Sequence, residues 1–95
     1  MPVRLSVAAQ LDLFQIALDG LDMFGPVQTE RYEAGLNKTL DFLSRNPRAA
    51  QEYDEYTPPV RICPYQAHVI IYRIEDDSIF IVRICHSRED WTRFA

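Results

Sequence analysis

The side chains that could take part in acid–base or phosphate chemistry lie in the last third of the chain. His68 and His86 are its two histidines, and His86 lies between Arg83 and Arg88. Cleavage of a phosphodiester needs an acid, a base and cations on the phosphate, so His86 is a candidate for a group that faces a phosphate. A histidine that ends a strand and hydrogen-bonds locally explains the same pattern, and for both histidines we favour this structural interpretation.

No metal or other cofactor is predicted. The two histidines and the two cysteines, Cys63 and Cys85, lack the CxxC or HxxxH spacing of zinc sites. The cysteines are expected on strands that a third strand separates, which places them about 9–10 Å apart. A disulfide requires Cα atoms within about 7 Å, so we expect two reduced thiols and a cytoplasmic protein.

Arginine is the cation of this region, and its side chains have two interpretations. Arg73 and Arg83 lie within apolar runs that predict strands. They either form ion pairs within the chain or bind a carboxylate of another protein through two guanidinium nitrogens. The candidate partners within the chain are Glu52, Asp54, Glu55 and Asp90. Trp91 is likewise either a cover over the core or an anchor at a protein interface.

The elements that must position these residues fit in one domain, since 95 residues are too few for two cores. The net charge of −4 disfavours a non-specific nucleic-acid binder. The negative excess lies in residues 1–59, whereas residues 60–95 carry equal numbers of arginines and acidic residues. No apolar run approaches the roughly 18 residues of a membrane span, and the N-terminus does not resemble a secretory signal.

Residues 7–24 predict a helix that is apolar on two sides. If the first stripe faces a sheet, another helix covers part of the second stripe. The part that this helix does not cover would then bind a partner protein. The first stripe consists of Val7, Leu11, Phe14, Leu18 and Leu21, and the second of Ala9, Leu13, Ile16, Met23 and Phe24.

Local signals delimit the helices. Leu5-Ser6 predicts a short strand that ends in a helix N-cap. Gly25-Pro26 ends the first helix and begins a second one over about residues 26–45, which makes an antiparallel helical hairpin. Asn46-Pro47 stops the second helix, and residues 47–59 predict a polar connection with little regular structure.

Three strands are expected in the rest of the chain, followed by a short helical turn or tail. They are residues 60–64, placed near a sheet edge, and residues 67–74 and 79–85, joined as a hairpin. The order β-α-α-β-β-β predicts an α+β fold in which the helical hairpin packs on a small antiparallel sheet.

This pattern resembles the RelE/ParE toxin superfamily, and within it the ParE-like branch, over nearly the whole chain. The resemblance rests on Asp12-Leu13 before an apolar helix, on Phe24-Gly25-Pro26 and on residues 40–47. It is strongest in residues 60–61, 68–74 and 81–90. The last of these segments has the family's ending, which is an arginine, two apolar residues, a histidine, and then a basic residue and an aspartate.

The resemblance implies a type II toxin that a small dimeric ParD-like antitoxin neutralises by wrapping its C-terminal segment around the toxin. ParE-like members trap DNA gyrase without being nucleases, and they meet nucleic acid only indirectly, through the antitoxin. RelE-like members cut mRNA in the ribosome. On this basis the candidate antitoxin-binding residues are Leu13, Ile16, Phe24, Arg73 and Arg83, and the candidate target-binding residues are Arg61, His86, Arg88 and Trp91.

The residues that RelE-like nucleases use are largely missing. Their arginine at the start of the second long strand corresponds to Val69 here, the only lysine is Lys38, and no tyrosine follows Asp90. We therefore predict a non-enzymatic toxin that inhibits gyrase. The alternatives are a ribosome-dependent mRNA interferase and a non-toxic module that retains antitoxin binding.

Overall fold

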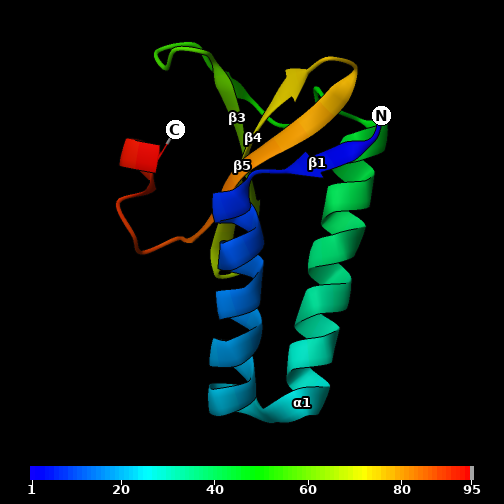
Figure 1. Cartoon of the computed structure of the whole chain (residues 1–95), viewed down its shortest axis with the longest axis vertical. Helices are drawn as coiled ribbons and strands as arrows, with labels where there is room; N and C mark the ends of the chain where they lie inside the picture. Colours follow the sequence, from blue (N-terminus) through cyan, green and yellow to red (C-terminus); the bar gives the residue numbers. More distant parts are fainter. Residues whose placement is uncertain (95) are drawn as a thin grey trace.

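The computed structural model describes residues 1–94 and consists of a long bent helix beside one twisted sheet (Figure 1). The helix α1 (Val7–Arg45) begins at Ser6, whose hydroxyl accepts a hydrogen bond from the Ala9 amide at 2.9 Å. At Gly25 the backbone leaves the helix with φ of 80°, and Pro26 follows it. Residues 7–24 and 26–45 thus form two antiparallel limbs, as the helical-hairpin prediction requires.

The sheet has five strands, β1 (Val3–Leu5), β2 (Glu52–Tyr53), β3 (Val60–Tyr65), β4 (His68–Glu75) and β5 (Ser78–His86), in the order β1-β5-β4-β3-β2. Asp76 and Asp77 both have positive φ in the tight turn between β4 and β5. A short 3-10 helix, η1 (Trp91–Phe94), follows β5, as the predicted helical turn anticipates.

Two details of the predicted sheet were wrong. The sheet is mixed, because β1 runs parallel to β5, while the other pairs are antiparallel. The helical hairpin returns the chain to the end where β1 begins, and there the Met1 amino group donates to the Ser44 carbonyl at 2.9 Å. From that end β3, β4 and β5 follow one another as antiparallel neighbours. The third of them, β5, therefore runs in the same direction as β1. The connection after the hairpin also contains β2, which pairs with the first residues of β3.

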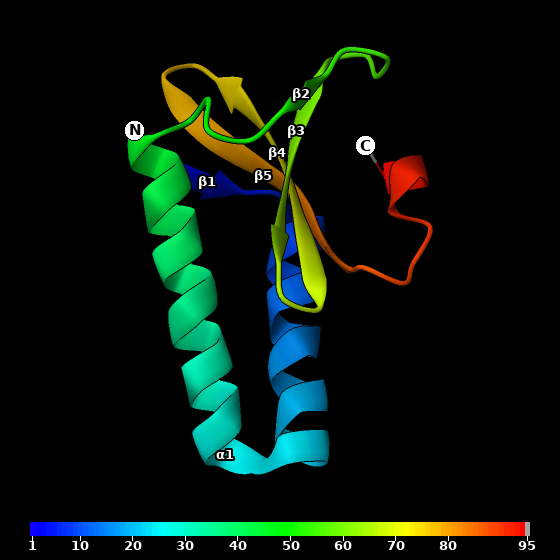
Figure 2. The same ribbon diagram turned by 180° about the vertical axis from the view of Figure 1, so that it is seen from behind.

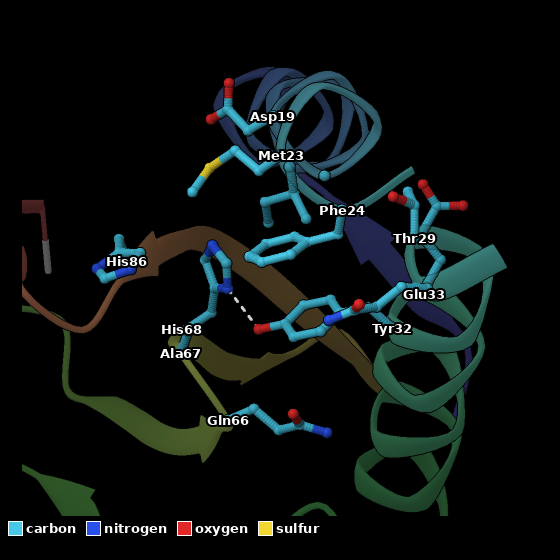
Figure 3. Close-up of a pocket in the computed structure, with 13 residues that line it drawn as sticks. Asp19, Met23, Phe24, Thr29, Tyr32, Glu33, Gln66, Ala67, His68 and His86 are labelled. Atoms are coloured by element: carbon cyan, nitrogen blue, oxygen red, sulfur yellow. Dashed lines mark hydrogen bonds between the residues drawn. The ribbon is translucent and has the colours of Figure 1, made fainter. Parts of the chain in front are cut away.

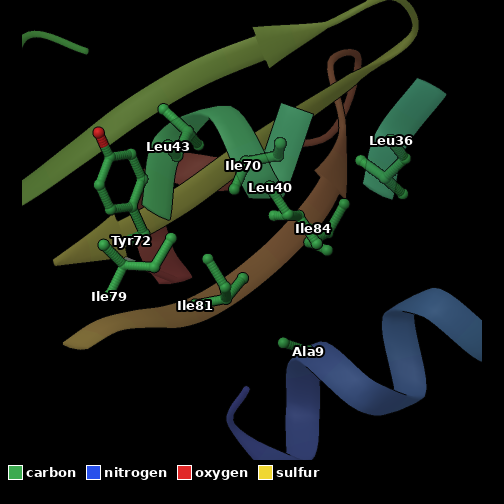
Figure 4. Packing of buried hydrophobic residues seen from close by; sticks show 9 residues of the cluster. All are labelled: Ala9, Leu36, Leu40, Leu43, Ile70, Tyr72, Ile79, Ile81 and Ile84. Atoms are coloured by element: carbon green, nitrogen blue, oxygen red, sulfur yellow. The ribbon is translucent and has the colours of Figure 1, made fainter. Parts of the chain in front are cut away.

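Both faces of the sheet are apolar, and each has its own cover. The helix-side cluster contains Ala9, Leu36, Leu40, Leu43, Ile70, Tyr72, Ile79, Ile81 and Ile84 (Figure 4). The far-face cluster contains Val60, Ile62, Val69, Ile71 and Cys85, with Tyr53, Tyr56, Val82 and Trp91 packed against it. Trp91 is therefore part of the cover on the far face, which is one of the two interpretations that its position allowed.

The predicted orientation of the N-terminal limb was wrong. Leu13 and Ile16 pack against the helix-side cluster, whereas the stripe from Val7 to Leu21 is exposed. The rotation of the limb is determined by Ser6, whose backbone amide donates to Ile81, and by Asp12, which reaches β5. These two contacts leave the first stripe facing away from the sheet.

The two cysteines lie where the separation argument places them. Cys63 is on β3 and Cys85 on β5, with β4 between these strands, and they pack on opposite sheet faces. Within residues 1–94, no helix combines the length and the apolar character that crossing a membrane requires.

Candidate functional site

A cavity of about 360 Å³ lies between the tip of the helical hairpin and the end of the sheet where β3 turns into β4 (Figure 3). The N-terminal limb contributes apolar side chains, the C-terminal limb Tyr32 and Glu33, and the sheet end polar groups. Met23 and Phe24 lean over the rings of His68 and Tyr32 in Figure 3. The lining includes Ile16, Asp19, Met23, Phe24, Tyr32, Glu33, Gln66, His68 and His86.

The polar side of this cavity is an aromatic cluster. The Tyr32 hydroxyl and Nδ1 of His68 are hydrogen-bonded at 2.6 Å, and the ring of His68 meets that of His86 edge to face at a centroid distance of 5.3 Å. Tyr65 packs on the other side of Tyr32, with its ring centroid 5.1 Å away. The sequence offered no signal for this cluster, because Tyr32 and His68 lie 36 positions apart in different elements.

His86 has the local hydrogen bonds that its position at the end of a strand suggested. Its Nδ1 accepts from the Arg88 amide at 3.1 Å, and its own amide donates to Glu89 at 3.2 Å. A neutral His86 therefore carries its proton on Nε2. Its predicted part in target binding is separate from these bonds and stays a prediction.

Burial lowers the pKa of His68 below its ordinary value, and the neighbouring His86 lowers it further. The unfolded chain consequently takes up a proton at position 68 at a higher pH than the folded chain does. Stability from this group is fully present above the unfolded pKa of about 6.5 and is lost as the pH falls through the folded pKa.

We expect the urea midpoint of the wild type to fall more between about pH 7.5 and about pH 5.5 than that of His68→Gln, which lacks the titrating ring. Urea unfolding at the two pH values measures this. His86→Gln is the matched control and should retain a clear pH-dependent fall. An identical pH dependence in the wild type and His68→Gln would contradict the assignment to His68.

Arg83 is held within the chain. Its Nε and Nη2 donate to the two carboxylate oxygens of Asp12 at 2.7 and 2.8 Å, and Asp12 also accepts from the Ile84 amide at 2.9 Å. These hydrogen bonds raise the pKa of the Arg83 guanidinium above its ordinary value. Asp12 thus joins the N-terminal limb to the part of β5 that continues past its pairing with β1. Asp12 was not among the ion-pair partners predicted for Arg83.

Two further arginines of the predicted site also have partners in the chain. Arg73 forms an ion pair with Glu75, and its guanidinium lies 5.0 Å from the centroid of the Phe80 ring, with Arg4 5.1 Å from the same ring. Arg61 donates to the Ala50 carbonyl at 2.7 Å and lies 3.5 Å from Glu52. Internal partners were predicted for Arg73 and Arg83 and not for Arg61, and Glu75 was not among them.

The structure gathers part of the predicted site and separates the rest. Phe24, His86 and Ile16 line the same cavity. Arg88 is exposed next to His86, whereas Arg61 and Arg73 line a second hollow of about 230 Å³ beside β2. The predicted target-binding residues thus do not form one patch.

Comparison with known proteins places this geometry in a family. The family described as "ParE toxin of type II toxin-antitoxin system, parDE" matches residues 3–91. Toxin ParE1 of Caulobacter vibrioides is 28% identical over 85 residues, which cover 90% of this chain and 88% of that protein. A solved chain of the chromosomal ParDE TA system from P. aeruginosa has the same fold, with a TM-score of 0.77 at 20% identity over 90% of this chain and 95% of that one. The chain therefore belongs to the ParE toxins of type II toxin-antitoxin systems.

Proposed function

We propose that this toxin is neutralised by a ParD-like antitoxin and that, when free, it inhibits DNA gyrase without acting as a nuclease. The observation that carries the proposal is the family match over residues 3–91, which spans every strand and both limbs of the hairpin. The antitoxin is the cognate partner that a parDE family implies, and gyrase is the target that the ParE-like branch implies.

The candidate antitoxin contacts extend along the sheet. Phe24 is 56% exposed beside the cavity and offers an apolar ring to a partner side chain. Arg73 lies on β4 five residues beyond His68, about 17 Å away at the spacing of a strand. A partner that reaches both must span about 17 Å of the toxin surface, as an antitoxin segment that wraps around the toxin would.

The internal hydrogen bonds support the non-nuclease reading. The mRNA-interferase alternative would use Arg83 and a histidine on the substrate phosphate. Here Arg83 is committed to Asp12, and Nδ1 of His86 already accepts a hydrogen bond from the Arg88 amide. A cation that already neutralises a carboxylate of its own chain is a poor clamp for a developing phosphate charge.

Supercoiling of relaxed plasmid by purified gyrase tests the target. The free toxin should inhibit supercoiling and leave gyrase-dependent DNA breaks, whereas toxin premixed with its antitoxin should do neither. Arg88→Ala should need about tenfold more toxin for half inhibition, as expected when a charged contact is lost. Arg48→Ala, on the exposed start of the connection, should match the wild type.

Three other outcomes would overturn parts of this proposal. Unchanged supercoiling in excess toxin excludes gyrase as the target. Codon-phased cleavage of ribosome-bound mRNA that is lost in His86→Ala identifies an interferase instead. Normal growth on induced expression of folded toxin without its antitoxin leaves an antitoxin-binding module that has lost toxicity.

A further inference from the structure

The outer side of the N-terminal limb carries an apolar seam that no contact within residues 1–94 buries. This outer seam consists of Val7, Leu11, Phe14, Leu18 and Leu21, whose side chains are 45–74% exposed. The opposite side of the limb already supplies Ala9, Leu13 and Ile16 to the core. Figures 1 and 2 both show the tip of the hairpin extending beyond the end of the sheet, which leaves much of the limb accessible.

The spacing of the outer seam is that of a helix–helix interface. Successive members lie four, three, four and three positions apart, which is the a/d repeat of a coiled coil and keeps all five side chains on one line. A helix that only covers a sheet has a broader stripe and needs no such repeat. The seam spans two heptads, about 21 Å of helix.

The seam is also nearly symmetric about its centre. When two copies are laid antiparallel, Val7 of one lies opposite Leu21 of the other, Leu11 lies opposite Leu18, and Phe14 meets Phe14. We propose that the outer seam binds a second copy of this chain as an antiparallel helix pair whose two-fold axis passes between the two Phe14 rings. Such an interface uses the same patch on both copies, as two-fold symmetry requires.

The charges beside the seam are compatible with this arrangement. Gln15 and the small Ala17 flank the centre, and the small Ala8 flanks the end beside Val7, so no like charges face each other there. Asp22 is the one charged residue beside the seam, and in the antiparallel pair it would lie near Ala8 of the second copy. The free amides at the start of a helix favour a carboxylate at that place. A parallel pair would instead bring both copies of Asp22 to the same end of the interface.

The area suits a weak and reversible dimer. Burying the exposed parts of five large side chains removes on the order of 500 Å² per copy, about 1,000 Å² in total, which is the lower limit for specific interfaces. We expect a dissociation constant in the micromolar range, because a small interface leaves little free energy after the cost of association. An antitoxin helix would need no symmetric seam, and this is why we assign the seam to a second copy.

Sedimentation of the purified free toxin across its micromolar range tests the proposal. Phe14→Glu places two like charges at the symmetry axis and should raise the dissociation constant by about 30-fold or more. Phe42→Glu is the matched control, because Phe42 is 52% exposed on the other limb and Phe14 63%, so that neither ring supports the core. Phe42→Glu should dimerise like the wild type, and circular dichroism should show both variants folded.

Cross-linking tests the direction of the pair. Phe14→Cys should cross-link with itself, whereas Val7→Cys and Leu21→Cys should cross-link with each other when mixed and not when alone, and the wild type gives the background of Cys63 and Cys85. Self-linking of Val7→Cys, a monomer at every concentration, or equal dissociation of the two glutamate variants would overturn the proposal. A monomer whose outer seam becomes protected when antitoxin is added would also overturn it and would identify an antitoxin helix as the occupant. None of these outcomes depends on gyrase inhibition.

Discussion

Asp12→Ala is expected to lower the free energy of unfolding by about 3 kcal/mol, the cost of leaving a largely buried charge without its partner. The Asp12 side chain is 14% exposed and that of Arg83 24%. Removing the carboxylate leaves the guanidinium uncompensated and also strands the Ile84 amide at the edge of β5. The N-terminal limb would lose the polar contact that determines its rotation against the sheet.

Urea unfolding of Asp12→Ala beside Asp41→Ala measures this effect. Asp41 forms an exposed pair with Arg45 at 3.3 Å, one turn away on the same helix, and its loss should cost less than about 0.5 kcal/mol. Asp12→Asn should fall between the two, because an amide oxygen in the place of Oδ2 still accepts two of the three hydrogen bonds. Equal stability of Asp12→Ala and Asp41→Ala would show that the Asp12–Arg83 pair is energetically neutral.

Gly35→Ala is expected to destabilise the protein by about 2 kcal/mol, although alanine is favoured over glycine within helices by about 1 kcal/mol. A Cβ at position 35 would overlap the Tyr65 hydroxyl and lie 3.0 Å from Cζ of that ring. The ring has little freedom to move, because its hydroxyl donates to the Tyr32 carbonyl at 3.0 Å and it meets the Tyr32 ring edge to face. The close approach that glycine allows here is between the C-terminal limb and β3.

A double-mutant cycle with Tyr65→Phe tests the cause. Removing the hydroxyl alone should cost about 1 kcal/mol for the lost hydrogen bond. In the Tyr65→Phe background the overlap is relieved, so Gly35→Ala should cost clearly less than it does in the wild type. If Gly35→Ala stabilises the wild type, helix propensity outweighs packing at this site.

Local chemistry made much of the fold predictable. Ser6 caps the helix, and Gly25-Pro26 breaks it, because the hydrogen bonds and dihedral angles that matter there involve neighbouring residues. The rotation of the N-terminal limb was not predictable, since its two sides are about equally apolar. The two contacts that determine it join Ser6 to Ile81 and Asp12 to Arg83, more than 70 positions away in each case. The strand β2 was not predicted, because a strand of two residues is too short to show an alternation of apolar and polar side chains.

In the candidate site, too, contacts between neighbouring residues were predictable and contacts between distant residues were not. The local hydrogen bonds of His86 could be predicted from its place at the end of a strand. Phe24 is exposed as predicted, although Leu13 and Ile16 of the same predicted stripe pack on the core. The pairing of Tyr32 with His68 could not be inferred, because the break at Gly25 and the turn between β3 and β4 bring them together. The family motif near the C-terminus indicated the class of protein without indicating this geometry.

The cover of the far face also affects thiol chemistry. Burial in the far-face cluster raises the pKa of Cys85 to about 11, so almost none of this side chain is thiolate at neutral pH. Since oxidants and electrophiles react with the thiolate, Cys85 is inert while Trp91 and its neighbours stay packed. A cover of a few side chains opens more readily than a helical layer does. The reactivity of Cys85 towards a thiol reagent is therefore a readout of how often the segment that carries Trp91 leaves the sheet.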